Sequence, residues 1–115
     1  MRRLFRIRGP CAAAAFWGHF DRVVRWENPG IISLADSRVV PFTLKGPMID
    51  ILSGSAMIHD NSMGRYPGVP GTPETRTAVH LGAHVDQATA HGNQFGGCRL
   101  VNDAGQRVIL ANNLP

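Results

Sequence analysis

One stretch of the chain, residues 53–77, constrains the fold more than any other feature. Its sequence, SGSAMIHDNSMGRYPGVPGTPETRT, is rich in glycine, proline, serine and asparagine. Such a stretch offers little apolar surface for a core, and long loops inside small domains are usually binding loops or subunit contacts. We therefore predict a long Pro/Gly-rich loop over residues 53–77 that contacts a partner.

The remainder of the chain must build one small core. The chain has 115 residues, of which 43% are hydrophobic and 17% are charged, which is typical of one globular domain rather than a disordered chain. The formal net charge is +4, and four arginines close to the N-terminus account for it: Arg2, Arg3, Arg6 and Arg8. We therefore predict a basic arm over residues 1–10 and a single domain over residues 11–115.

The basic arm favours two interpretations. It holds four arginines and no acid before Asp21, a composition that resembles a mitochondrial presequence. If the arm is retained, we expect it to bind a negatively charged partner, because neighbouring arginines repel each other. The candidate partners are an acidic protein subunit, RNA and a phospholipid surface. The alternative is a solvated tail without a role. A broad nucleic-acid-binding face on the body is not indicated, since the other basic residues only balance the acids.

Cysteine content and hydropathy bear on location. Two cysteines, Cys11 and Cys98, are too few for a disulfide framework, which favours an intracellular chain, either mitochondrial or cytoplasmic. The longest apolar run, CAAAAFW, is far shorter than the ~20 residues that a membrane-spanning helix needs. We expect no transmembrane segment.

The pattern of apolar residues predicts one helix and several strands. Over residues 11–26 an apolar stripe at helical spacing predicts an amphipathic helix, which Pro10 begins and the NPG sequence at 28–30 ends; the stripe is Phe16, Trp17, Phe20, Val23 and Val24. GIISL at 30–34, VVPFTL at 39–44 and MIDIL at 48–52 predict strands, and residues 98–110 predict a hairpin. No internal repeat is visible. The predicted fold is α+β: one N-terminal amphipathic helix, then a small, mainly antiparallel β-sheet or barrel.

Three of the five histidines lie in one stretch, HLGAHVDQATAHGNQFGGC, at residues 80–98. His80 and His84 are four residues apart and Asp86 follows, and these side chains are competent ligands for zinc or manganese. His91 is placed to serve as a base that activates a metal-bound water. The alternative is that these histidines are ordinary imidazoles bonded to the backbone, in a chain without a cofactor.

The same stretch carries a family resemblance. HLGAHVD resembles the H-x-G-T-H-x-D signature of the metal-dependent cyclase family that includes bacterial kynurenine formamidase, with Ala83 at the usual threonine position. IDILS at 49–53 and MGRYPGVPG at 63–71 resemble two further motifs of that family, so the resemblance covers residues 49–97 in short patches. It implies an amide or lactam hydrolase with His80, His84 and Asp86 as metal ligands and His91 as the catalytic histidine.

Three functional hypotheses follow. We favour a non-catalytic accessory or structural subunit of a larger assembly, which contacts other protein subunits through the basic arm and residues 53–77. The first alternative is a cyclase-type hydrolase or a remnant of one. The second is an RNA-associated module that uses Arg2, Arg3, Arg6 and Arg8 on phosphate groups, for which steep salt dependence is the expected mark.

Overall fold

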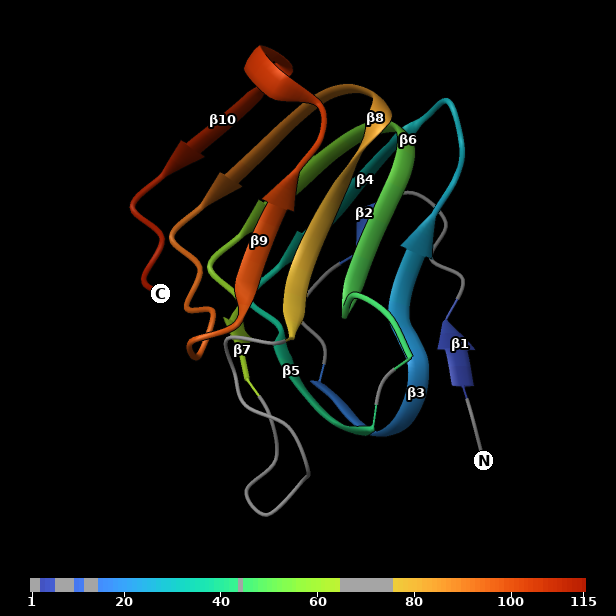
Figure 1. The fold of residues 1–115 in the computed structure, drawn as a ribbon, viewed down its shortest axis with the longest axis vertical. Helices are drawn as coiled ribbons and strands as arrows, with labels where there is room; N and C mark the ends of the chain where they lie inside the picture. The colour runs from blue at the N-terminus through green and yellow to red at the C-terminus, as the bar shows by residue number, and fades with distance from the viewer. Residues whose placement is uncertain (1–2, 6–9, 12–14, 44, 65–75) are drawn as a thin grey trace.

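The structure is a computed structural model that describes residues 3–5, 10–11, 15–43, 45–64 and 76–115. These residues form ten strands and one short 3-10 helix, and the described part of the chain contains no α-helix (Figure 1). The elements are β1 (Arg3–Phe5), β2 (Pro10–Cys11), β3 (Ala15–Trp26), β4 (Ile31–Ala35), β5 (Arg38–Thr43), β6 (Ile49–His59), β7 (Ser62–Met63), β8 (Thr77–His91), β9 (Arg99–Asn102), η2 (Gly105–Arg107) and β10 (Val108–Ala111).

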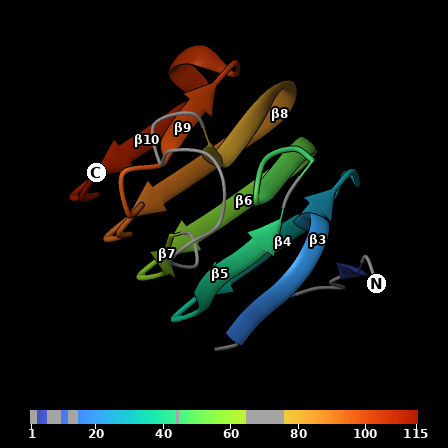
Figure 2. The same cartoon turned by 60° about the horizontal axis from the view of Figure 1, so that its bottom comes forward.

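Every strand pair in the described residues is parallel. Between a strand and the next strand that it pairs with, the chain completes one full turn, which we call a coil. Ile31 on β4 pairs with Ser55 on β6, Ser55 pairs with Gln87 on β8, and β8 pairs with β10 further along. Parallel neighbours require a crossover between them, and here each crossover is the rest of the coil. The architecture is therefore a parallel β-helix, and Figure 2 shows its strands stacked from β3 to β10.

Three sheets form the sides of the β-helix. The first contains the end of β3, the beginnings of β6 and β8, and β9. The second, which we call the groove sheet, contains β4, the ends of β6 and β8, and β10. The third contains the beginning of β3, β5 and β7, and isolated bridges extend it to Gln94 and Leu114.

β6 and β8 are long because each bends from the first sheet into the groove sheet. The bend in β6 lies at Gly54, which has a φ of 75° and where the register of β6 on β8 shifts. A Cβ at this position would overlap the carbonyl oxygens of Asn28 and Gly30. Only glycine fits this backbone and this space without strain.

A second corner is built from residues with left-handed backbones. Asp36, Asp60, Gly92 and Asn112 occupy the corner between the groove sheet and the third sheet, with φ values of 51°, 58°, 69° and 55°. Asp, Asn and Gly are the residue types that accept this conformation most readily. Because the four corners follow strands that are paired in register, they repeat once per coil.

The residues after three of these corners form an asparagine ladder (Asn61, Asn93 and Asn113). Asn61 Nδ2 donates to Asn93 Oδ1 at 3.0 Å, and Asn93 Nδ2 donates to Asn113 Oδ1 at 3.0 Å. Each Nδ2 also donates to a backbone oxygen of the preceding coil: Leu34, Ile58 and Ala90. Asn61 and Asn93 are 2% and 0% exposed, so these bonds satisfy polar groups that water cannot reach.

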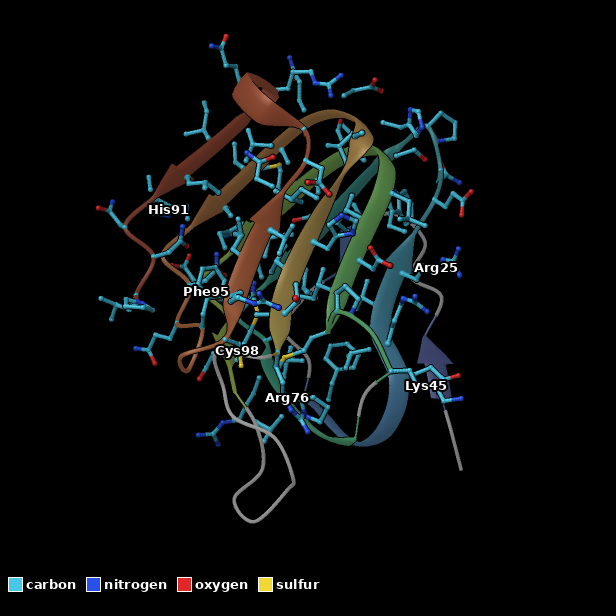
Figure 3. All side chains as sticks on the ribbon, viewed as in Figure 1. Arg25, Lys45, Arg76, His91, Phe95 and Cys98 are labelled. Atoms are coloured by element: carbon cyan, nitrogen blue, oxygen red, sulfur yellow. The ribbon has the colours of Figure 1, made fainter. Side chains whose placement is uncertain are left out.

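Apolar columns fill the interior. Leu34, Ile58 and Ala90 stack in register from coil to coil, and each is at most 1% exposed. Phe95 and Cys98 are also buried, and Figure 3 labels Cys98 below Phe95. Alternate residues point outward, so the side chains on the outer faces of the strands are available for other contacts.

The α+β prediction is wrong. Residues 11–26 do not form an amphipathic helix, because β3 covers Ala15–Trp26 and pairs with β1, β5 and β6. The amides of Val23 and Val24 both donate to the Met48 oxygen, at 2.9 Å each, which marks a bulge that turns two successive residues inward. This bulge gave the strand a helix-like pattern. The side chains of Trp17 and Phe20 lie outside the described part of the chain.

The antiparallel sheet or barrel and the terminal hairpin are also corrected. β9 and β10 do not pair with each other, because each lies parallel to a different part of β8. The strands expected near 30–34, 39–44 and 48–52 do form, as β4, β5 and β6. The stretch expected to be a loop at 53–77 begins in strand, since β6 continues to His59 and β7 follows, and residues 65–75 lie outside the described residues.

A search of the described residues for a helix long and apolar enough to cross a membrane finds none.

Candidate functional site

The four residues predicted to hold a metal or to act beside it all lie on β8. His80 is half-buried in the first sheet, whereas His84 and Asp86 are exposed around the bend, and His91 is exposed at the end of the strand. Figure 3 places His91 on the side of the molecule opposite Arg25. Among the described residues, no three His, Cys, Asp or Glu side chains are arranged to hold a metal ion. Zinc or manganese binding by His80, His84 and Asp86 stays a prediction.

His80 instead belongs to a charged ladder (Arg22, Asp50, His80 and Asp103) that crosses successive coils. Arg22 Nε donates to Asp50 Oδ2 at 2.9 Å. His80 Nδ1 lies 2.8 Å from Asp50 Oδ1, and His80 Nε2 lies 2.8 Å from Asp103 Oδ2. Charges of opposite sign therefore alternate along the ladder, from β3 through β6 and β8 to the segment after β9.

The ladder favours a protonated His80. Burial by itself would lower the pKa of His80, but its hydrogen bonds to Asp50 and Asp103 and the charges of these two carboxylates outweigh burial and raise the pKa. Both ring nitrogens face carboxylate oxygens, and only the imidazolium donates from both. An imidazole held in this way joins coils together, and neither nitrogen is left to act as a base on a substrate.

A groove lies on the outer face of the groove sheet. Its volume is about 620 Å³. Apolar side chains form its floor, and Ile31, Met57 and Ile109 are 62%, 47% and 65% exposed. They come from β4, β6 and β10, three strands of different coils, and the register of the sheet brings them together because Met57 pairs with Thr89 and Thr89 pairs with Ile109. Large exposed apolar side chains gathered in one place indicate an interaction surface.

Polar and charged groups lie between and beside these apolar side chains. Thr89 lines the groove between Met57 and Ile109, and Asp86 and Arg107 add one negative and one positive charge. Arg107 is held in place, since its Nη2 donates to the Ala83 oxygen at 2.7 Å and its Nε donates to the Ala104 oxygen at 3.1 Å. An apolar floor with a fixed positive charge and an exposed carboxylate beside it is suited to binding a complementary surface in one orientation.

Sequence reasoning missed both features. Met57 lies in the stretch interpreted as a loop, and Ile109 lies in the segment interpreted as a hairpin arm, so neither strand was expected to border Ile31. Asp50 and Asp103 carry no local motif that connects them with His80. Pairing between strands that are distant in the sequence forms the coil that brings these residues together. The only local signal was the alternation along β4, in which the outward residues Ile31, Ser33 and Ala35 alternate with buried ones.

The basic arm falls mostly outside the described residues. Arg2, Arg6 and Arg8 lie there, and Arg3 is placed only as a backbone position in β1, next to β3. The proposed contacts of these four arginines with protein or phosphate stay predictions.

Comparison with known proteins adds no family. No family model matches the chain. No curated protein matches it, and no solved structure matches it. The resemblance of residues 49–97 to the metal-dependent cyclases therefore stays a hypothesis drawn from the motifs.

Proposed function

We propose that this chain is a non-catalytic accessory subunit that docks a partner protein in the groove of its β-helix. The observation that carries the proposal is that three exposed apolar side chains, Ile31, Met57 and Ile109, line one groove. Burying such side chains against a partner removes apolar surface from water, which is the main driving force of protein association. Strand pairing on both sides of β6 and β8 keeps the floor rigid before binding.

The chemistry of the groove restricts the partner. Its docking segment has an apolar face for Ile31, Met57 and Ile109, a basic side chain toward Asp86 and an acidic side chain toward Arg107. Ser55, Ala56 and Met57 also line the groove and belong to residues 53–77, which the sequence indicated as a contact segment. These three residues lie in strand β6 and not in the predicted loop, so they line the groove as part of the sheet. The basic arm supplies a second candidate contact.

The test compares two variants of the full chain with equal changes of charge. Met57→Lys places a cation on the groove floor, and Glu27→Gln removes an exposed anion from the turn after β3. We expect the partner isolated with the wild-type chain from its native source to be lost from Met57→Lys and kept by Glu27→Gln. Amide hydrogen exchange of the wild-type complex is expected to slow in β4, the end of β6 and β10.

Two results would overturn docking in the groove. One is equal recovery of the partner by Met57→Lys and by the wild-type chain. The other is loss of the partner only when residues 1–8 are removed, with unchanged exchange on the groove sheet, which would place the contact on the basic arm.

A further inference from the structure

The groove sheet carries a pair of histidines where β6 and β8 end. His59 on β6 pairs with His91 on β8, so the two residues lie next to each other in neighbouring parallel strands. Both side chains point outward, since the preceding residues, Ile58 and Ala90, are 1% and 0% exposed. Neighbouring strands are about 4.8 Å apart, so two imidazoles on one face can reach a common point in the solvent.

Small residues flank this pair. In the register of the groove sheet, Ala35 of β4 lies beside His59, and Ala111 of β10 lies beside His91. A methyl group extends less far from the sheet than an imidazole does, so the two rings have room to turn toward each other. His91, labelled in Figure 3, is exposed, and the His59 side chain is 35% exposed. The sheet therefore presents two accessible imidazoles side by side.

Hydrogen bonds orient both rings. His59 Nδ1 lies 3.2 Å from Asp60 Oδ2, and because a carboxylate only accepts, the proton is on Nδ1 and Nε2 keeps its lone pair. A histidine that ligates a metal usually donates its other ring proton to a carboxylate in this way. His91 Nε2 lies 3.4 Å from Asn112 Nδ2, which fits a weak hydrogen bond to an unprotonated Nε2. Each ring therefore offers Nε2 as a ligand.

The carboxylates beside the pair favour a cation. Asp60 follows His59 directly, and Asp36 occupies the equivalent corner of the preceding coil. Arg38 is two residues past Asp36, but it begins β5 and belongs to the third sheet, around the corner from the histidines. The acidic groups are thus closer to the imidazoles along the chain than this basic group is, and they lower the cost of bringing a positive ion to the pair.

We propose that His59 and His91 form a surface site for one late first-row transition metal ion, with Cu²⁺ bound more tightly than Zn²⁺. Imidazole suits both ions, and this order of affinity is the usual one for divalent metals. Two imidazoles and water molecules complete the coordination, which is consistent with the described residues holding no group of three His, Cys, Asp or Glu side chains. The site shares no side chain with the groove and goes beyond the proposed docking of a partner.

The experiment measures binding of Cu²⁺ and of Zn²⁺ to the untagged full chain by equilibrium dialysis with elemental analysis. We expect saturable binding of one ion per chain. His59→Gln and His91→Gln are each expected to weaken Cu²⁺ binding by roughly a hundredfold, because a single imidazole remains. Zn²⁺ repeats the test with an ion that does not oxidise the thiols of Cys11 and Cys98.

Asp60→Asn tests the orientation of the His59 ring. Asparagine accepts the left-handed backbone of this corner, where Asp60 has a φ of 58°, but it binds the Nδ1 proton less strongly than a carboxylate does. We expect Cu²⁺ binding to weaken by roughly tenfold, as for other partners of metal-bound histidines. Circular dichroism of each variant reports whether it is folded.

His84→Gln is the matched control, since His84 is also exposed on β8. It is expected to bind Cu²⁺ as the wild-type chain does, which separates this site from the metal binding predicted for His80, His84 and Asp86. Nuclear magnetic resonance of the wild-type chain locates the ion directly. Substoichiometric Cu²⁺ is expected to broaden the ring protons of His59 and His91 before those of the other histidines.

Four results would overturn the proposal. They are a wild-type chain that binds neither ion saturably, binding that folded His59→Gln or folded His91→Gln retains in full, loss of binding in His84→Gln, and broadening that begins at other histidines. The last result needs no variant, so it decides the question even if a substitution unfolds the chain. All four are measured without a partner protein, so this proposal and docking in the groove succeed or fail separately.

Discussion

Asn93 shows how one side chain fixes the spacing of three coils. Its Oδ1 accepts from the Asn61 amide at 3.1 Å and from Asn61 Nδ2 at 3.0 Å, and its Nδ2 donates to the Ile58 oxygen and to Asn113. The residue is completely buried. Removing it would leave several buried polar groups without a partner, and each such group costs about 1–3 kcal/mol.

We therefore predict that Asn93→Ala lowers the free energy of unfolding by roughly 3 kcal/mol or more, as measured by urea denaturation. Asn113→Ala is the comparison, because Asn113 holds an equivalent position at the end of the ladder and is only half-buried. We expect a clearly smaller loss for Asn113→Ala. An equal loss of unfolding free energy in the two variants would show that the buried position of Asn93 does not increase its contribution to stability.

At the scale of elements, the long strands depend on glycine at their bends. Gly54 combines a φ of 75° with carbonyl oxygens that leave no room for a Cβ. Gly105, which begins η2, has a φ of 68° but no atom within 4 Å of the position that a Cβ would take. The two positions therefore separate the effect of backbone strain from the effect of crowding.

We predict that Gly105→Ala costs about 1 kcal/mol of unfolding free energy, the usual penalty for a left-handed alanine. Gly54→Ala is expected to cost roughly 3 kcal/mol or more, since the crowded carbonyl groups must also move and bend β6. Chemical denaturation of both variants measures the difference. A Gly54→Ala chain as stable as Gly105→Ala would contradict the role of this glycine in the bend.

The same bends explain why the type of element was mistaken in residues 11–26. In a straight strand every second residue faces inward, but the bulge at Val23 and Val24 turns two neighbours inward and β3 changes sheets along its length. Apolar residues then recur at intervals that mimic a helix. The short run of β4 pairs with β6 without a register shift, and its β-branched residues predicted a strand correctly. β5 contains an irregularity, because Gly18 pairs with Pro41 and His19 pairs with Thr43, but its β-branched residues still predicted a strand.

At the scale of the whole molecule, the charged ladder ties coils together and makes stability depend on pH. The pKa of His80 is raised above its ordinary value of 6.5 by Asp50 and Asp103, against the effect of burial. The contribution of His80 to stability is therefore fully present below pH 6.5, and it is lost as the pH rises through the raised pKa. The Asp103 carboxylate is 56% exposed, so water screens its share of the interaction.

We predict that unfolding free energy falls by up to about 1 kcal/mol as the pH rises across this window. Asp103→Asn is expected to flatten the fall, because the remaining partner of His80 is Asp50 alone. Asp36→Asn is the control, because it removes the same charge at an exposed corner away from the ladder. We expect it to keep the wild-type dependence of unfolding free energy on pH. Thermal melting as a function of pH checks the prediction, and a wild-type slope in Asp103→Asn would contradict it.

Coils of unequal length hid the repeat from the sequence. Ile31 pairs with Ser55, Ser55 pairs with Gln87, and Ala88 pairs with Val108, so the structural repeat has no constant period in the chain. The corners that do recur contain Asp36, Asp60, Gly92 and Asn112. These are different residue types that adopt the same left-handed backbone conformation. The repeat is one of conformation, and a search for repeated residues does not detect it.

The sequence by itself determined the basic composition of residues 1–10 and the local strand tendency of residues near 30–34, 39–44 and 48–52, because composition and side-chain branching act locally. The tertiary structure alone decided that the strands pair in parallel, that His80 lies between Asp50 and Asp103, and that Ile31, Met57 and Ile109 share one groove. These arrangements depend on hydrogen bonds between strands that are distant in the chain. No local pattern of residues specifies which distant strand a given strand will pair with.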